Sequence, residues 1–571
     1  MRERPTILSR LPTHTRRLAN GLTVLVREDH AAPVVAIVTH VKAGYFHEPD
    51  RLVGVSHLLE HMYFKGTARR GAGEIARETK AAGGYLNAGT IYDCTYYYTV
   101  LPAAALEQGL DIQSDALRNS TLDEEELQKE LLVILQEARR KRDNPEAVAI
   151  ESLYEEMFDV HRMRRWRIGT EEQLRRLTRD DVWEYYRRLY RPSNIVLAIA
   201  GDVDPARAFA LVERFYGDIP AGEPAVEPGP AEPERRGFRL RERAGDIVRG
   251  RIEWGWRTPG TTHPDTPLLD LLAIVLGQGR ASRLYREVRE AGLATEAAAY
   301  HYTPTEIGVF GISTELASAD ALPALEATWR AVERVHRDGV SPAELERARN
   351  LLEARLLRRL ETVEGQATLL AEWQALGDWR LADRYLARAL AADAAELCRV
   401  ARTYLALDRA TVLFYRPESV PGLGCAAAEV EARLARADGR RTTPPPAARP
   451  PAAPALLRAG RARAAWVDDG VHFYELEGTS GIAIRPRPSP LVSIALCCRG
   501  GTLRETEANA GITGLMARLS LQGTVTRSAA RLAEESETLG GVIAPGVSPD
   551  LVSWTIGLPA RHFERGLDLL A

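Results

Sequence analysis

Two histidines and a glutamate within five positions are the residues of this sequence best suited to chemistry. Residues 54–67 read GVSHLLEHMYFKGT, which contains His57, Glu60 and His61. Side chains three and four positions apart lie on one face of a helix, so both imidazoles could bind one metal ion, with the Glu60 carboxylate beside them to activate water. The spacing therefore indicates metal-assisted hydrolysis. The alternative is that both histidines are ordinary core or surface residues.

A catalytic zinc ion bound by two histidines usually has a third protein ligand and an open position for water. Residues 127–140 read LQKELLVILQEARR, a strongly helical pattern. Within it, Glu130 and Glu137 lie seven positions apart on a stripe that also carries apolar side chains. Carboxylates that border an apolar face favour a partner. The alternative for each glutamate is a solvated edge of the helix.

The elements that must position these groups are strands followed by helices. Apolar runs and alternation predict strands at residues 22–26 and 34–41, and helical spacing begins at residue 54. Such a mixture of strands and covering helices indicates an α+β fold. The same patterns predict further strands at 96–101, 195–200, 251–256 and 309–314, and helices at 103–118, 124–142, 147–158, 170–190, 205–215, 264–276, 283–290 and 341–376.

Two proline-rich stretches divide the chain. Residues 217–236 and 436–459 are too rich in proline to continue a helix or a central strand, so we interpret them as linkers. We therefore predict three domains. The first, at 17–220, contains the metal motif; the second, at 237–436, has no cluster of histidine and glutamate; the third is a partial unit at 462–571.

The third unit repeats the first at a constant offset of 457 residues. Gly44 falls on Gly501 and Glu48 on Glu505, and several other glycines coincide. Matching glycines at turns imply matching backbone conformations, because a Cβ atom is least tolerated there. The two units are therefore predicted to share one fold. Since a repeat of the second unit would end far beyond Ala571, we also expect this chain to be part of a longer protein.

The repeat departs from the first unit at the metal motif. None of its residues there offers a ligand or a base for zinc chemistry. The third unit is therefore predicted to keep the fold without the catalyst. His57, Glu60 and His61 correspond to Gly514, Ala517 and Arg518, in that order.

Composition limits the other functions. The 571 residues carry 75 basic and 78 acidic side chains, a net charge of -3, so no overall field favours a nucleic acid or an anionic membrane as partner. No run of about 18 apolar residues indicates a membrane span, and the N-terminal stretch lacks the apolar core of a secretory signal. We therefore expect a cytoplasmic protein. The five cysteines are predicted to be mostly reduced core residues, with Cys497 and Cys498 in a core strand.

The linked motifs resemble those of the insulinase/pitrilysin family of zinc metallopeptidases, which includes the mitochondrial processing peptidase. The resemblance rests on the inverted HxxEH motif and on Glu137, which follows after a further 75 residues. It also rests on GGYLNAGT at 83–90 and on GQGRASRLYREVREAGLA at 277–294. Together these features extend over nearly the whole chain.

The resemblance assigns roles to single residues. Glu130 would support catalysis by orienting a metal ligand. Asn87 and Ala88 would belong to an edge strand that pairs with an extended substrate, the alternative being an ordinary exposed strand end. The implied ligands of one zinc ion are His57, His61 and Glu137, and the implied general base is Glu60.

The same resemblance implies repeated α/β sandwich units, each an antiparallel-rich sheet covered by helices, paired into the halves of a clamshell. It implies a zinc-dependent endopeptidase that hydrolyses peptides or unfolded polypeptide segments in an enclosed chamber. Two alternatives stay open: a non-catalytic scaffold or assembly subunit of the same family, and a processing peptidase that needs a partner chain. A homo-oligomer is also open.

Overall fold

The computed structural model describes residues 11–222, 229–317, 321–436, 463–476 and 481–571. Contacts divide the chain into two compact units. The first unit holds the described residues up to 278 together with 282–345 and 358–436, and the second holds 279–281, 346–357 and the described residues from 463 onward.

The predicted domain limits are not settled by this division. The first unit contains both the 17–220 segment and most of the 237–436 segment. Residue 462 and nearly all of the second predicted linker lie outside the described residues. The three-domain division and the pairing of units into a clamshell therefore stay predictions.

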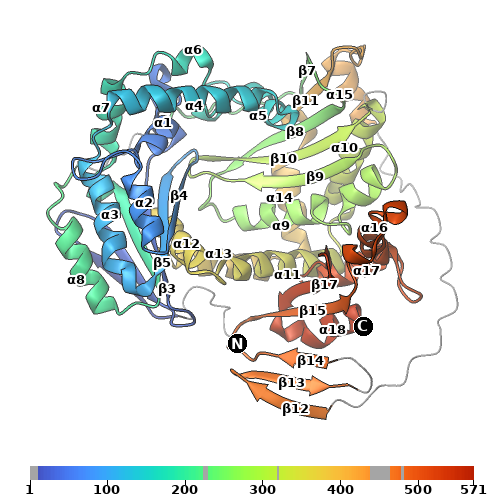
Figure 1. Cartoon of the computed structure of the whole chain (residues 1–571). Helices are drawn as coiled ribbons and strands as arrows, with labels where there is room; N and C mark the ends of the chain where they lie inside the picture. Colours follow the sequence, from blue (N-terminus) through green and yellow to red (C-terminus); the bar gives the residue numbers. More distant parts are fainter. Residues whose placement is uncertain (1–10, 223–228, 318–320, 437–462, 477–480) are drawn as a thin grey trace. The chain divides into compact units, whose positions relative to one another are not determined.

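A six-stranded sheet carries the N-terminal half of the first unit. Its order is β1-β2-β6-β3-β5-β4, and all pairs are antiparallel except β2 with β6. β4 forms one end of this sheet (Figure 1). The predicted mixture of helices with an antiparallel-rich sheet is confirmed. The strands are β1 (Thr13–Arg17), β2 (Thr23–Glu28), β3 (Val34–Val41), β4 (Tyr85–Thr90), β5 (Thr95–Pro102) and β6 (Ile195–Gly201).

The inner strands of this sheet, such as β3 and β6, are buried on both faces. Along β3, Val35 and Ile37 belong to one core, whereas Ala36 and Val38 belong to another. Successive side chains of a strand point to opposite faces, so a continuous apolar run suits a strand covered on both sides. The helices that contribute to the first of these cores include α1 (Val55–Met62), α3 (Leu106–Asn119), α7 (Arg179–Leu189) and α8 (Pro205–Tyr216).

The second core of the six-stranded sheet is closed by a helix from the other half of the unit. α12 (Val363–Ala375) packs on β3 and β6. In return, α5 (Pro145–Met157) packs on β8 and β11 of the second sheet. The two halves of the first unit therefore exchange one covering helix each.

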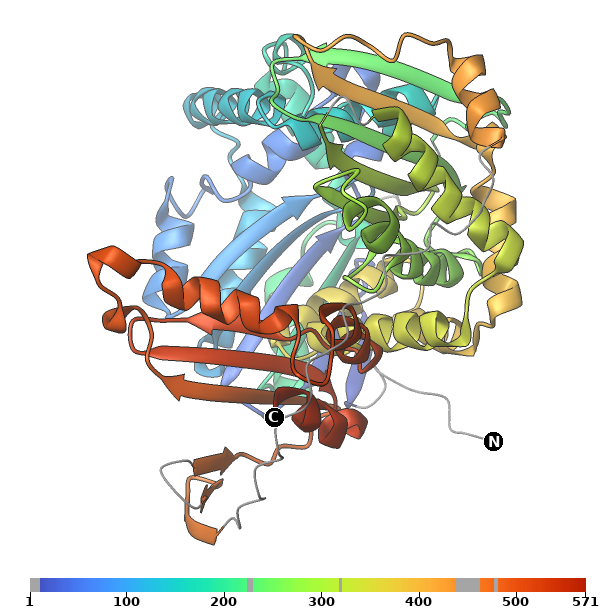
Figure 2. The ribbon, with the colours of Figure 1, turned by 90° about the vertical axis from the view of Figure 1, so that its right-hand side faces the viewer.

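The second sheet has five strands in the order β7-β11-β8-β10-β9, and only β7 and β11 are parallel. The helices α9, α10 and α14 contact its strands, and Figure 2 shows α10, in yellow-green, lying along this sheet. The elements are β7 (Arg239–Gly245), β8 (Gly250–Pro259), β9 (Glu296–Tyr302), β10 (Ile307–Leu316), β11 (Thr411–Pro417), α9 (Thr266–Gly277), α10 (Ala321–Asp338) and α14 (Ala394–Tyr404). Further helices are α2 (Glu74–Ala81), α4 (Glu124–Arg142), α6 (Glu171–Leu174), α11 (Pro342–Arg359), α13 (Leu381–Ala391) and α15 (Ala427–Ala435).

The second unit repeats the first elements of the chain in order. With the offset of 457 residues, β3 falls on β15, α1 on α16 and β5 on β17. The predicted use of one fold twice is therefore confirmed at the level of secondary structure. The elements are β15 (Leu491–Arg499), α16 (Ile512–Leu519), α17 (Ala529–Thr538), β16 (Ala544–Val547), β17 (Leu551–Pro559) and α18 (Phe563–Leu570), preceded by the small sheet β12 (Arg463–Asp468), β13 (Val471–Glu475) and β14 (Gly481–Ile484).

Two predictions were wrong. Residues 170–190 form two helices rather than one, because Thr170 and Thr178 each begin a new helix with a capping box.

The cysteines are also less buried than predicted: Cys497 and Cys498 are exposed, and of the five only Cys94 is buried. β15 pairs only with β17 among the described residues, whereas its counterpart β3 lies between two strands and under a helix.

Candidate metal centre

The helix that carries the histidines begins at a buried carboxylate. Glu48, of which 1% is exposed, accepts hydrogen bonds from the backbone N–H groups of Gly54 at 3.0 Å and Ser56 at 2.9 Å. Gly54 has a φ of 96°, and an added Cβ would lie 2.7 Å from the Leu174 side chain. Because the first N–H groups of a helix have no partner within it, Glu48 and Gly54 fix where α1 starts.

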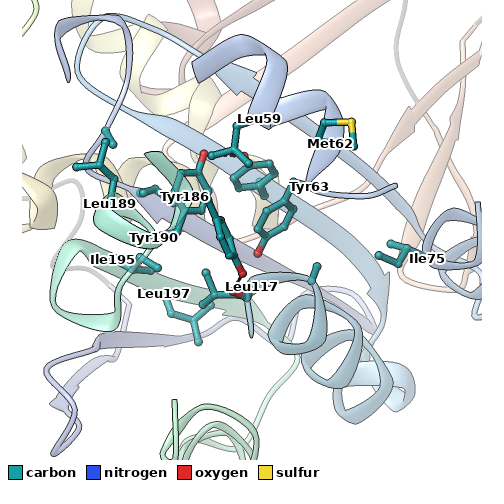
Figure 3. Close-up of a cluster of buried hydrophobic side chains, with 14 of the residues drawn as sticks. Leu59, Met62, Tyr63, Ile75, Leu117, Tyr186, Leu189, Tyr190, Ile195 and Leu197 are labelled. Carbon is teal, nitrogen blue, oxygen red and sulfur yellow. Dashed lines mark hydrogen bonds between the residues drawn. The ribbon is translucent and has the colours of Figure 1, made fainter. Parts of the chain in front are cut away.

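The apolar face of α1 fixes its rotation. Leu59 and Met62 of α1 belong to a buried cluster that also contains Tyr190 (Figure 3). α1 also contacts α4, α7 and β4. A helix with one apolar stripe buries that stripe and leaves the opposite face for other groups. The groups left there are His57, Glu60 and His61, all partly buried.

α4 supplies the carboxylates. Asp123 caps this helix by accepting hydrogen bonds from two backbone N–H groups of its first turn, and a stripe that includes Leu127 and Ile134 is buried. Glu137 Oε2 lies 3.7 Å from Nε2 of His57 and 3.7 Å from Nε2 of His61. Among the described residues, these three form the one group of histidine, cysteine or acidic side chains with metal-binding geometry.

The donor set fits zinc. The three ligand atoms lie within 4.8 Å of one another, and two ligands of a tetrahedral zinc ion are about 3.4 Å apart. Burial, together with the nearby charges of His61 and Lys141, lowers the pKa of His57 to about 3. His57 is therefore neutral near pH 7, the form in which imidazole binds a metal. Two imidazole nitrogens and one carboxylate oxygen would hold the ion and leave its fourth position open.

Glu130 contacts the ligand His61 through Nδ1, the ring nitrogen that does not face Glu137. Its Oε2 lies 3.0 Å from Nδ1 of His61, and its Oε1 lies 2.5 Å from the Lys65 ammonium. Burial raises the pKa of Glu130, but the hydrogen bonds from Lys65 and His61 outweigh it and hold the pKa below its usual value. An anionic partner on Nδ1 directs Nε2 of His61 toward a metal ion. The corresponding Nδ1 of His57 is buried and has no hydrogen-bond partner in the described part of the chain.

Glu60 lies beside the ligands and is hydrogen-bonded to Thr90. The Thr90 hydroxyl donates a hydrogen bond of 2.6 Å to Glu60 Oε2. Burial raises the pKa of Glu60, and the hydrogen bond from Thr90 opposes this rise. A carboxylate with a raised pKa next to a metal-binding group is suited to accept and return a proton.

Asn87 and Ala88 lie on β4, which pairs only with β5 among the described residues. Asn87 is exposed, and its side-chain oxygen accepts a hydrogen bond of 2.9 Å from the backbone N–H of Ala88. The strand is thus at the sheet edge where the sequence interpretation placed it. A role for these two residues in substrate binding stays a prediction.

Two residues that contact the site were not singled out from the sequence. Thr90 ends the stretch GGYLNAGT, and Lys65 lies within GVSHLLEHMYFKGT. Both stretches were recognised as motifs, but neither pattern indicates which partner each side chain meets. Thr90 is 30 residues from Glu60, and Lys65 is 65 residues from Glu130.

Family models match three segments of the chain. The model described as Insulinase (Peptidase family M16) matches residues 23–171 and 482–571, and the model described as Peptidase M16 inactive domain matches residues 176–352. The insulinase model therefore matches the chain twice, once at each copy of the internal repeat. None of the helices in the described part of the chain has the length and apolar character that crossing a lipid bilayer requires.

Single proteins are also similar. An uncharacterized zinc protease of Rickettsia felis is 32% identical over 356 residues, which cover 61% of this chain and 84% of the relative. The probable mitochondrial-processing peptidase subunit beta of Arabidopsis thaliana is 28% identical over 414 residues, or 70% of this chain and 77% of the relative. The crystal structure of a protease from Helicobacter pylori matches with a TM-score of 0.68 and 25% identity, covering 71% of this chain and 100% of that one.

Proposed function

Because the chain belongs to the insulinase family of peptidases, peptidase family M16, we propose that it is a zinc-dependent endopeptidase. The observation that carries the proposal is the convergence of His57, His61 and Glu137 beside Glu60. We further propose one zinc ion, because these ligands form a single group in the described residues. The substrates would be peptides or unfolded polypeptide segments.

The proposed division of work follows from the chemistry of each group. A zinc ion, when bound, lowers the pKa of its water to about 7 and polarises the scissile carbonyl. Glu60 takes the proton of the attacking water. Because Thr90 holds Oε2 of Glu60 at 2.6 Å, Oε1 is the oxygen that accepts this proton and then passes it to the leaving amine.

Glu130 and Lys65 would act through a ligand. Glu130 lies 3.0 Å from His61 Nδ1 and 2.5 Å from the Lys65 ammonium, so the three residues form a chain that ends at His61 Nδ1. The anionic carboxylate holds the Nδ1 proton of the ring, so Nε2 stays available. This chain also fixes the ring orientation, which a ligand in a three-residue donor set needs.

The edge strand β4 supports peptides as substrates. An unpaired edge offers a row of backbone N–H and C=O groups that an extended peptide can pair with. Asn87 and Ala88 lie on this strand, and Thr90 at its end contacts Glu60. A peptide must be extended to pair there, so folded segments would not be cleaved.

The test is an assay of the purified chain with a quenched fluorescent peptide, with and without a zinc chelator, together with measurement of bound zinc. We expect cleavage to stop with the chelator and to return with added zinc. Glu60→Gln should keep its zinc and cleave about 100- to 10,000-fold more slowly. Glu564→Gln, an exposed glutamate on α18, is the matched control and should behave like the unchanged chain.

A second candidate is a processing peptidase that needs a partner chain. It is favoured by the similarity to a relative that is named as a subunit. Bound zinc without cleavage by the purified chain would support this candidate, and cleavage that appears on addition of a second protein would establish it. No bound zinc at all would contradict both candidates.

A further inference from the structure

The hydrogen bond between Thr90 and Glu60 is short and lies at the proposed reaction centre. The Thr90 hydroxyl is 2.6 Å from Glu60 Oε2, and both groups are partly buried. The nearest other contact of this hydroxyl is Thr95 Oγ1, at 3.3 Å. Thr95 donates its own hydrogen bond to the backbone carbonyl of Ala43 at 2.9 Å, so it does not compete for Glu60.

The backbone around Thr90 is held firmly. Thr90 pairs with Thr95 where β4 turns into β5. The turn is bound to the segment before α1, because the N–H of Tyr45 donates to the carbonyl of Ile91 at 3.1 Å. Gly44 permits this close approach, since a Cβ there would lie 2.1 Å from the same carbonyl oxygen. Thr90 therefore presents its hydroxyl from a preorganised position.

The internal repeat shows what this position needs for folding alone. At the offset of 457 residues, Thr90 becomes Val547 and Glu60 becomes Ala517. The turn is kept: the N–H of Thr502 donates to the carbonyl of Ser548 at 3.2 Å, and a Cβ on Gly501 would lie 2.3 Å from that oxygen. Valine therefore satisfies the fold here, and the hydroxyl occurs where a glutamate is present to receive it.

We infer that Thr90 is a positioning residue that holds the Glu60 carboxylate in the orientation for proton transfer. The inference rests on the proposed peptidase function. With Oε2 bound to Thr90, the carboxylate cannot rotate freely, and Oε1 is left as the oxygen available to the attacking water. The bond also links the base to β4, the strand proposed to bind the substrate. The base and the bound peptide therefore keep a fixed position relative to each other.

The test compares Thr90→Val, which removes the hydroxyl at nearly constant shape, with Thr90→Ser, which keeps it. For Thr90→Val we expect kcat to fall about 10- to 100-fold, because a hydrogen bond to a charged group is lost. KM and bound zinc should stay unchanged. Thr90→Ser should restore most of kcat. Thr95→Val, whose counterpart in the repeat is Val552, is the control and should change kcat by less than about threefold.

Each other result would overturn the inference. A Thr90→Ser variant as slow as Thr90→Val would show that shape rather than the hydroxyl matters, and a loss of zinc or a rise in KM alone would indicate a structural role. If the unchanged chain cleaves and Thr90→Val matches it, the positioning role fails while the peptidase function stands. If the unchanged chain binds zinc without cleaving any peptide, the proposal of a peptidase active by itself fails, and the positioning role, which rests on that activity, fails with it.

Discussion

The helices α1 and α16 begin with the same cap but in different surroundings. Glu48 accepts hydrogen bonds from two backbone N–H groups at 3.0 and 2.9 Å, and Glu505 accepts two equivalent bonds at 2.7 and 2.9 Å. Burial outweighs these bonds at Glu48 and raises its pKa to about 7. At Glu505, the hydrogen bonds from Thr513 and Gly511 outweigh the slight burial and lower the pKa. The same cap geometry therefore goes with opposite pKa shifts of the two glutamates, because the packing around them differs.

The comparison also separates the scaffold from the chemistry. The cap is kept in both regions, and so is an arginine that binds carboxylates after the helix, Arg70 in one and Arg527 in the other. The two histidine ligands, the base and its hydroxyl partner are replaced together. The fold therefore does not depend on the residues of the candidate site. Four experiments test or refine this separation.

The largest effect should come from a metal ligand. In His57→Gln, the donor set loses one of its two imidazole nitrogens. Even the loss of a residue that only hydrogen-bonds a zinc ligand lowers metal affinity or activity by about 10- to 100-fold. We expect zinc affinity and cleavage to fall by more than about 100-fold, with no change in the second unit. Zinc titration and peptide assays measure both effects. The control is His30→Gln, an exposed histidine beside Asp202; a similar loss there would contradict the assignment.

The arginines should differ in their contribution to stability. Arg70, with 8% of its side chain exposed, binds Glu78 at 3.0 Å and Asp115 at 2.6 Å. Removing one partner of such a buried cluster costs about 3–5 kcal/mol. Arg527, with 22% exposed, lies in a more solvated pair, which is worth about 1 kcal/mol or less. Hydrogen exchange at α2 in Arg70→Gln and at α17 in Arg527→Gln reports each region separately. Equal losses would contradict the comparison.

The two caps should respond oppositely to pH. An unfolded glutamate titrates near pH 4.5, whereas folded Glu48 titrates near 7. Between these values the folded chain retains a proton that the unfolded chain has released, so the free energy of unfolding falls as pH rises, by about 3 kcal/mol in total. The contribution of Glu505 is instead present above pH 4.5 and is lost as pH falls below it.

Glu48→Gln should therefore remove part of the pH dependence between 4.5 and 7, measured by hydrogen exchange at α1. Glu505→Gln serves as the control and should leave that window unchanged. A pH profile at α1 that is the same in Glu48→Gln and in the unchanged chain would show that Glu48 does not titrate in this range.

The smallest effect should come from restoring the hydroxyl in the repeat. In Val547→Thr the new hydroxyl meets Ala517 rather than a carboxylate at the equivalent position. We expect the stability of the second unit to change by no more than about 0.5 kcal/mol, and zinc content and cleavage to stay the same. A clear change in cleavage would mean that the second unit takes part in the chemistry.

Much of the fold followed from local patterns. The strand at 34–41 and the helix at 124–142 have the predicted limits, because an apolar run and a regular helical stripe are strong signals. The break between α6 and α7 was missed, since two threonine caps within a helical pattern compete with its continuation. The exchange of α5 and α12 between the two sheets was also beyond local patterns, because the pairing of distant elements depends on which faces fit.

The sequence by itself determined that two histidines and a glutamate share a helical face, that α4 carries two carboxylates on one stripe, and that the chain repeats without the motif. Only the tertiary structure decided that Glu137 faces both Nε2 atoms while Glu130 faces Nδ1 of His61. It also decided that Thr90 meets Glu60 and that Glu48 is buried while Glu505 is not. The physical reason is that periodicity fixes which face a side chain occupies, whereas its partner, burial and pKa are set by residues far away in the chain that pack against that face.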